Sequence, residues 1–120
     1  MKILIMGAGK MGSFFIDLLS FDHEVAAYER DARRLRFTYN CQRFTSLEEV
    51  KGFQPELVIN AVTVRYTILA FEEVLPILPK DCILSDISSV KTGLKGWYDQ
   101  CGHPYVSTHP MIGPTFANLN

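Results

Sequence analysis

The feature that most constrains the fold is a glycine motif close to the N-terminus. An apolar run over residues 3–6 is long enough for a buried strand, and it leads directly into Gly-x-Gly-x-x-Gly, formed by Gly7, Gly9 and Gly12. Apolar residues then recur with the spacing of a helix that buries one face, at Met11, Phe14, Phe15, Leu18 and Leu19. The motif is therefore predicted to form the turn between a strand and a helix.

A strand-to-helix turn of this kind can bind a phosphate. Gly7 is expected to permit the tight turn, Gly9 to let the backbone approach a pyrophosphate, and Gly12 to let the helix pack closely on the strand. The N–H groups and the positive dipole end at the helix start would bind the phosphate oxygens. The sequence thus predicts a dinucleotide site over the whole motif, Gly7, Ala8, Gly9, Lys10, Met11 and Gly12. A glycine-rich turn in an unrelated α/β protein is the alternative.

An acidic residue follows a second short strand, which is predicted over residues 24–28. Glu29 lies 22 positions after Gly7, near the offset of about 20 residues at which an acid binds the ribose hydroxyls of NAD. Its carboxylate would also repel the additional phosphate of NADP. Arg30 and two further arginines follow, however, and could pair with that phosphate. The sequence favours NAD over NADP, and an exposed acid in a loop is the other interpretation of Glu29.

Strands and helices alternate along the rest of the chain. Apolar runs predict strands over residues 56–62, 82–86 and 104–107, and a short edge strand around Arg43 and Phe44. Helices are expected over residues 31–37, from a Ser46–Glu49 capping box to Gly52, from after Thr63 to before Pro76, and around Leu94 and Trp97. This alternation predicts an α/β fold, a doubly wound Rossmann sheet of about six mostly parallel strands with helices on both faces.

Candidate ligand-binding residues follow three of these strands. In doubly wound sheets, ligands lie beyond the carboxyl ends of the strands. Val62 and Thr63 are therefore expected beside the cofactor, while Ser89 and Lys91 follow the next strand and His109 follows the last. Helix capping by a serine, a solvent-exposed lysine and a structural histidine before proline are the alternatives.

Composition excludes several other classes of protein. The 120 residues are 48% hydrophobic and carry a formal net charge of −1, which is typical of one soluble domain with a real core. The absence of a Lys/Arg block argues against a nucleic-acid partner. No apolar run approaches the ~20 residues of a membrane span, and no signal peptide precedes the first strand, so we expect a cytoplasmic protein. Three scattered cysteines without C-x-x-C suggest neither disulfides nor a metal site.

Three stretches together resemble the N-terminal half of prephenate dehydrogenase. They are the glycine motif over residues 7–12, the segment over residues 78–91 that ends in Ser-Val-Lys, and His-Pro-Met-Ile-Gly-Pro over residues 109–114. The last two are far more specific than the glycine motif. They are most similar to the enzyme type that is fused to chorismate mutase, although no mutase segment is present here.

The resemblance implies oxidative decarboxylation of prephenate to 4-hydroxyphenylpyruvate, a step toward tyrosine, with NAD as hydride acceptor. His109 matches the catalytic histidine of the family, and a neutral imidazole can take the hydroxyl proton near pH 7. Ser89 matches a serine that bonds the same hydroxyl or orients the histidine. Lys91 belongs to the same motif at the substrate side, where it would contribute local electrostatics.

The resemblance also implies a larger enzyme, of which residues 1–120 are the NAD-binding domain. A second, mostly helical domain would supply an arginine for the substrate carboxylates and form a homodimer, so we expect negligible turnover by these residues alone. Thr115 stands where relatives often carry an acidic residue. Arogenate dehydrogenase, a β-hydroxyacid dehydrogenase and a non-catalytic NAD-binding or sensing domain remain alternatives.

Overall fold

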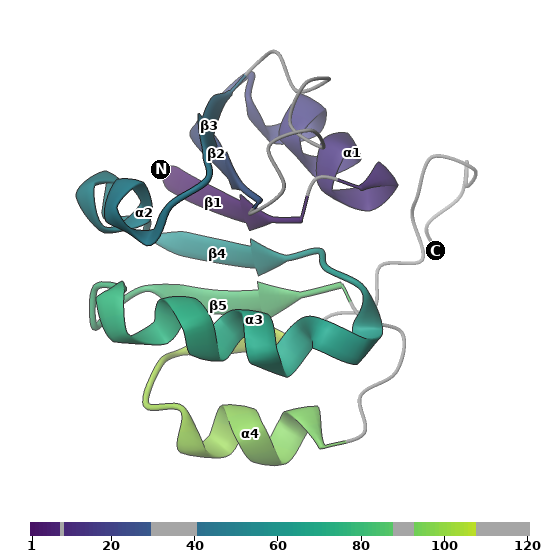
Figure 1. Ribbon diagram of the computed structural model, residues 1–120, viewed down its shortest axis with the longest axis vertical. Coiled ribbons are helices and arrows are strands. Elements are labelled where there is room, and N and C mark those ends of the chain that lie inside the picture. The colour runs from purple at the N-terminus through teal and green to yellow at the C-terminus, as the bar shows by residue number, and fades with distance from the viewer. Residues whose placement is uncertain (8, 30–40, 88–92, 108–120) are drawn as a thin grey trace.

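The fold is built on one six-stranded sheet, in which every strand is parallel to its neighbours. The computed structural model describes residues 1–7, 9–29, 41–87 and 93–107. The strand order is β3-β2-β1-β4-β5-β6 (Figure 1). The strands are β1 (Lys2–Met6), β2 (Glu24–Tyr28), β3 (Gln42–Phe44), β4 (Leu57–Asn60), β5 (Ile83–Asp86) and β6 (Tyr105–Ser107). This order confirms the predicted doubly wound α/β fold.

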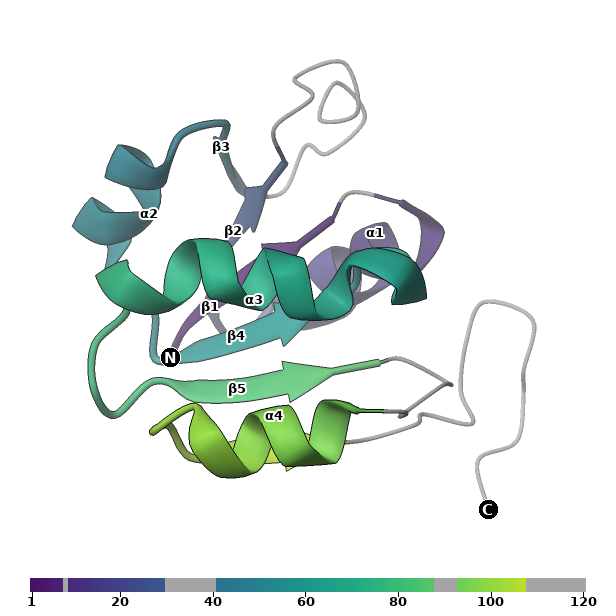
Figure 2. The same ribbon diagram turned by 60° about the horizontal axis from the view of Figure 1, so that its bottom comes forward.

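The helices in the described part of the chain cover both faces of the sheet. Helix α1 packs on one face, whereas α2, α3 and α4 pack on the other, as Figures 1 and 2 show. The helices are α1 (Lys10–Leu19), α2 (Leu47–Phe53), α3 (Thr67–Val74) and α4 (Leu94–Gln100), with short 3-10 turns η2 (Val64–Tyr66) and η3 (Leu75–Ile77) at the two ends of α3. The helix expected over residues 31–37 lies outside the described residues.

The central strands are buried on both faces, as is usual for parallel sheets. Ile3 and Ile5 pack beneath α1, whereas Leu4 and Met6 face the opposite layer, because successive side chains of a strand point to opposite faces. In register, Met6 lies beside both Tyr28 of β2 and Asn60 of β4. The three strands therefore end at the same edge of the sheet. The strand order reverses between β1 and β4, which is the place where doubly wound sheets bind ligands.

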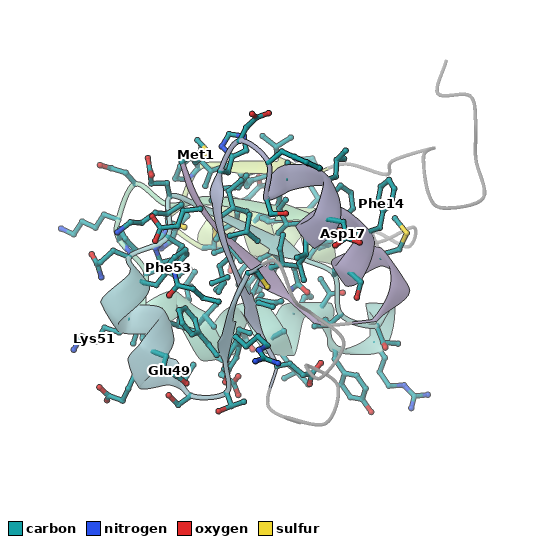
Figure 3. The ribbon with its side chains drawn as sticks, turned by 90° about the horizontal axis from the view of Figure 1, so that it is seen from above. Met1, Phe14, Asp17, Glu49, Lys51 and Phe53 are labelled. Carbon is teal, nitrogen blue, oxygen red and sulfur yellow. The ribbon has the colours of Figure 1, made fainter. Side chains whose placement is uncertain are left out.

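The predicted buried face of α1 was partly wrong. The helix is present, but its most buried side chain is Ile16, which is 1% exposed, while Leu18 of the predicted stripe is 52% exposed. Phe14 projects from α1 away from the strands (Figure 3). The reason is the close packing of Gly12, described below, which turns the Gly12–Ile16 side of the helix toward the sheet.

Helix α2 begins as predicted but ends later than expected. Ser46 and Glu49 form the capping box, in which the Ser46 side chain accepts from the Glu49 N–H and the Glu49 carboxylate accepts from the Ser46 N–H. The helix runs through Gly52 and Phe53 and stops at Gln54, whose φ of 54° is left-handed. A glycine inside a helix costs only about 1 kcal/mol, so Gly52 does not have to end it.

No helix within the described ranges is both long enough and apolar enough to cross a membrane. Among those same residues, no three histidine, cysteine, aspartate or glutamate side chains gather as a metal site.

Candidate nucleotide-binding site

The turn between β1 and α1 can be built only with glycine at two of its positions. Gly7 has a φ of +93°, and an added Cβ would lie 3.1 Å from the backbone of Ala61 and of Val62. At Gly12, an added Cβ would collide with the Gly7 carbonyl oxygen. The tight turn and the close helix packing expected of these two glycines are therefore present.

The third glycine of the motif is not required by packing. Gly9 is the N-cap residue of α1, and a Cβ built on it would meet no atom within 4 Å. As a glycine, Gly9 has no side chain with which to cap the helix, so the first-turn N–H groups of α1 need a partner other than the side chain of their N-cap residue. An uncapped helix start beneath open space fits a bound anion, which makes the turn suitable for a pyrophosphate.

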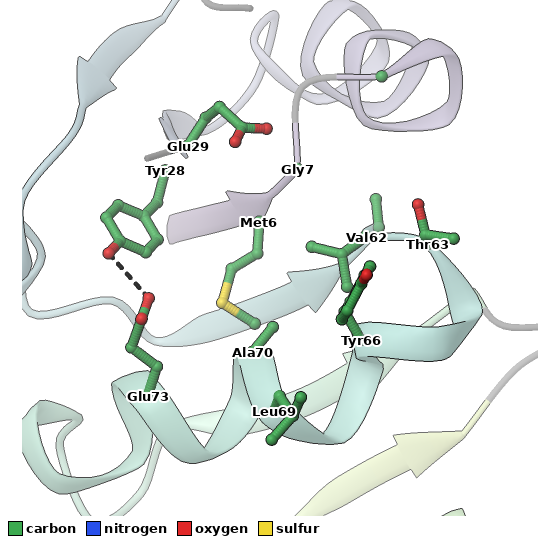
Figure 4. A pocket seen from close by; sticks show the side chains of 12 residues that line it. Met6, Gly7, Tyr28, Glu29, Val62, Thr63, Tyr66, Leu69, Ala70 and Glu73 are labelled. Atoms are coloured by element: carbon green, nitrogen blue, oxygen red, sulfur yellow. Dashed lines mark hydrogen bonds between the residues drawn. The ribbon is translucent and has the colours of Figure 1, made fainter. Parts of the chain in front are cut away.

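A pocket of about 770 Å³ extends from this turn across the carboxyl ends of β1, β2 and β4. Five residues that the sequence predicted as cofactor neighbours line it, namely Gly7, Gly9, Glu29, Val62 and Thr63 (Figure 4). The backbone N–H of Glu29 donates to the Phe44 carbonyl oxygen at 3.0 Å, which fixes this acid at the end of β2. The fold thus brings together residues that lie up to 56 positions apart in the chain.

One wall of the pocket comes from the end of η2 and from α3, and it was not predicted. Tyr66, Leu69, Ala70 and Glu73 line it, with the i, i+3, i+4, i+7 spacing of a single helix face. Tyr66 and Leu69 are large apolar residues with 51% and 62% exposure. The core-facing side of the same helix carries Thr67, Phe71 and Val74. The sequence signal was a helix with apolar residues on more than the one side that its core needs.

A buried asparagine, also not predicted, holds the β4–α3 connection. Asn60 is 1% exposed. Its Nδ2 donates to the Thr67 carbonyl oxygen at 2.8 Å, and its Oδ1 accepts from the Val62 N–H at 3.2 Å. These bonds fix the segment that contains Val62 and Thr63. The only signal in the sequence is one amide at the end of an apolar strand.

At the end of β5, a buried acid is held by an aromatic hydroxyl. Tyr98 donates to Asp86 Oδ1 at 2.7 Å, and Asp86 is 0% exposed. Burial raises the pKa of Tyr98 well above its usual value, and the hydrogen bond to Asp86 raises it further. Asp86 pairs in register with Ser107 of β6. The chain segments that follow β5 and β6 therefore leave neighbouring strands at the same edge of the sheet.

Five of the remaining predicted site residues are not placed by the structure. Ala8, Arg30, Ser89, Lys91 and His109 lie outside the described residues. Two others belong to the first turn of α1, where Lys10 is the first helical residue and Met11 is partly buried. Their predicted roles stay predictions.

Comparison with known families gives a match over most of the chain. The prephenate dehydrogenase, nucleotide-binding domain family matches residues 10–119. Among solved structures, prephenate dehydrogenase from Aquifex aeolicus in complex with hydroxyphenyl propionate and NAD+ superposes with a TM-score of 0.83 at 25% identity, over 92% of this chain and 41% of that chain.

Two other dehydrogenases share the fold at lower identity. Arogenate dehydrogenase from Synechocystis has a TM-score of 0.80 and 19% identity, over 97% of this chain and 43% of that chain. For 3-hydroxyisobutyrate dehydrogenase from Mycobacterium tuberculosis the values are 0.78, 17%, 93% and 41%. The chain thus spans about two-fifths of the length of each of these proteins.

The family match and the glycine turn both indicate a nucleotide-binding domain. The matched region covers 110 of the 120 residues, and it includes all of the pocket residues that follow the turn. The chain therefore belongs to the family of prephenate dehydrogenase nucleotide-binding domains.

Proposed function

We propose that this chain is the NAD-binding part of an enzyme that converts prephenate to 4-hydroxyphenylpyruvate by oxidative decarboxylation. The observation that carries the proposal is the uncapped start of α1 at Gly9, which opens into the pocket that Glu29 borders. The family match supports the same assignment, and a similar solved protein binds NAD+.

The pocket residues have separate roles in this proposal. The first-turn N–H groups of α1 bind the pyrophosphate, with the rest of the glycine motif around it. Glu29 accepts hydrogen bonds from the ribose hydroxyls, and its charge disfavours the additional phosphate of NADP. Val62 and Thr63 form the opposite wall, and Arg30 is assigned to cofactor binding from the sequence alone.

The proposed chemistry depends on the segments after β5 and β6. NAD, when bound, accepts a hydride from the ring carbon that carries the hydroxyl. His109 takes the proton of that hydroxyl as a neutral imidazole. Ser89 hydrogen-bonds the same hydroxyl or orients the histidine, and Lys91 adds positive charge nearby. Loss of carbon dioxide then makes the ring aromatic, which makes the step effectively irreversible.

The complete enzyme is proposed to be larger than these 120 residues. A second, mostly helical domain would supply an arginine for the substrate carboxylates and form a homodimer in the cytoplasm. Without such a cation the dianionic substrate is held poorly, so residues 1–120 alone are expected to show negligible turnover.

Two alternatives use the same pocket. Arogenate is a second candidate substrate, since an arogenate dehydrogenase shares the fold over 97% of this chain. A non-catalytic NAD-binding or sensing domain would use the same pocket without the segments after β5 and β6.

The test is NADH formation by the protein made from the whole gene, supplied with prephenate and NAD. Parallel reactions contain arogenate in place of prephenate and NADP in place of NAD. The expected result is NADH formation that depends on prephenate. Loss of this activity in His109→Asn would support the role of His109 as the proton acceptor. If folded protein binds NAD but forms no reduced cofactor in any combination, the proposed enzymatic activity would be overturned and the sensing domain favoured.

A further inference from the structure

One side-chain hydrogen bond closes the pocket at the end away from Val62 and Thr63. The Tyr28 hydroxyl donates to Glu73 Oε1 at 2.9 Å, across 45 positions of sequence. Tyr28 is the last residue of β2 and is 7% exposed, whereas Glu73 lies in the last turn of α3. Both residues line the pocket, and Figure 4 shows them together at one end of it.

The order of the elements indicates which part of a dinucleotide reaches this end. This step rests on the proposed function, in which the pyrophosphate lies at Gly9 and a ribose at Glu29. The base attached to that ribose must then continue past β2, over the pocket-facing side of α3. Leu69 and Ala70 provide an apolar surface there, and Glu73 follows them one turn later on the same face.

We propose that Glu73 recognises the exocyclic amino group of adenine and that Tyr28 positions the carboxylate for this contact. An ionised carboxylate is purely an acceptor and has about four lone-pair sites, so it can serve the Tyr28 hydroxyl and further donors together. The amino group of adenine is a donor. In hypoxanthine a carbonyl oxygen replaces it, and two acceptors facing each other repel.

This role differs from that of a simple brace between β2 and α3. A brace would keep the pocket in shape for any dinucleotide, so its loss would weaken all of them equally. A carboxylate that hydrogen-bonds the amino group instead changes the ratio between the affinity for a dinucleotide with this group and the affinity for one without it. The test therefore compares NAD with nicotinamide hypoxanthine dinucleotide, in which a carbonyl oxygen replaces this amino group and the adjacent N1 carries a hydrogen.

The experiment measures both dissociation constants by calorimetry for the wild type, Glu73→Gln and Tyr28→Phe. The wild type should bind NAD about tenfold more tightly than the hypoxanthine analogue, since a hydrogen bond to a charged group is exchanged for a repulsive contact. In Glu73→Gln the two dissociation constants should become about equal, because the glutamine amide can donate to the carbonyl oxygen of hypoxanthine. Tyr28→Phe should give an intermediate ratio.

The neighbouring acid supplies a matched control. Glu72 lies on the same turn of α3 but is exposed, and its carboxylate accepts from Trp97 Nε1 at 3.3 Å, on α4. Glu72→Gln removes the same charge from the same helix and should keep the wild-type ratio.

The outcomes separate this inference from the proposed function. Equal binding of the two dinucleotides by the wild type, or an unchanged preference in Glu73→Gln, would overturn the role of Glu73 and leave the NAD site standing. Failure of the folded wild type to bind either dinucleotide would overturn both proposals.

Discussion

Helices α1 and α2 both follow a strand, but their first turns are completed in opposite ways. At the start of α2, Ser46 and Glu49 satisfy backbone N–H groups with their own side chains. At the start of α1, Gly9 offers no side chain, and the open space above it belongs to the pocket. Both N-cap residues have extended backbones. The difference lies in what binds the helix N–H groups, which is the protein itself in α2 and, in the proposed function, the pyrophosphate of NAD in α1.

The largest expected effect comes from breaking the α1 turn at Gly12. Gly12→Ala places a methyl group against the backbone carbonyl of Gly7, which no side-chain rotation can relieve. We expect a loss of about 3 kcal/mol in the free energy of unfolding, at the upper end of the usual range for overpacked sites, measured with urea.

Gly96→Ala is the control for Gly12→Ala. Gly96 lies in α4, and an added Cβ would meet nothing within 4 Å there. This variant should gain about 0.5–1 kcal/mol, because alanine is the better helix former. Equal effects of the two substitutions would show that close packing does not explain Gly12.

The start of α3 gives a third arrangement, in which a buried amide anchors the connection. Asn60→Asp keeps an acceptor for the Val62 N–H but replaces the donor to the Thr67 carbonyl oxygen with an acceptor. We expect a loss of about 2 kcal/mol in the free energy of unfolding at pH 7, as for a buried group left without its partner. A loss below about 0.5 kcal/mol would mean that this segment is held by other contacts.

A single substitution can give α1 the kind of cap that α2 has. In Gly9→Ser, the hydroxyl can accept from a first-turn N–H group, and the open space accommodates it. The free energy of unfolding should change by less than about 0.5 kcal/mol. NAD should nevertheless bind at least about tenfold more weakly, because the hydroxyl competes with the pyrophosphate and prevents its close approach. Unchanged NAD affinity would contradict a pyrophosphate at this helix start.

Local patterns in the sequence were sufficient to predict most of the framework. Strand β2 was predicted over residues 24–28 and is observed over Glu24–Tyr28. The capping box and the glycine turn are likewise short-range features, in which nearby residues satisfy each other. Such features depend little on the rest of the fold, so the sequence alone indicates them.

The features that the sequence predicted wrongly or not at all depend on how the helices and strands pack on one another. The buried face of α1 is selected by the Gly12 contact, which favours Ile16 over Leu18 although both are apolar. The pocket-facing side of α3 was not predicted, because the apolar pattern of the helix does not show which of its residues line the pocket, where Leu69 is 62% exposed. The Tyr28–Glu73 bond spans 45 residues. The hydrophobic periodicity of a single sequence does not indicate such a pair.

A smaller effect is expected from removing the α2 cap itself. Ser46→Ala deletes the oxygen that accepts from the Glu49 N–H, which should cost about 1 kcal/mol of unfolding free energy. The affinity for NAD should not change, since α2 does not contribute to the pocket. A parallel loss of NAD binding would contradict the separation of the two helix starts.

The smallest effect concerns the pH dependence of the same cap. Hydrogen bonds from the Thr45 N–H, and then from Ser46, hold the pKa of the exposed Glu49 carboxylate below its usual 4.5. Because the folded pKa is the lower one, the ionised box stabilises the fold above about pH 4.5, and this contribution is lost as the pH falls through the folded pKa. The stability difference between the wild type and Glu49→Gln should therefore shrink in acid.

Glu48→Gln provides the comparison for this pH effect. Glu48 is also exposed and lies in the same first turn of α2, so its variant removes an equal charge from the helix dipole without touching the box. A larger acid-dependent change in Glu49→Gln than in Glu48→Gln would assign the effect to the hydrogen bonds. If the two variants followed the same pH curve, charge at the helix start would be sufficient, and the side-chain cap would not distinguish α2 from α1.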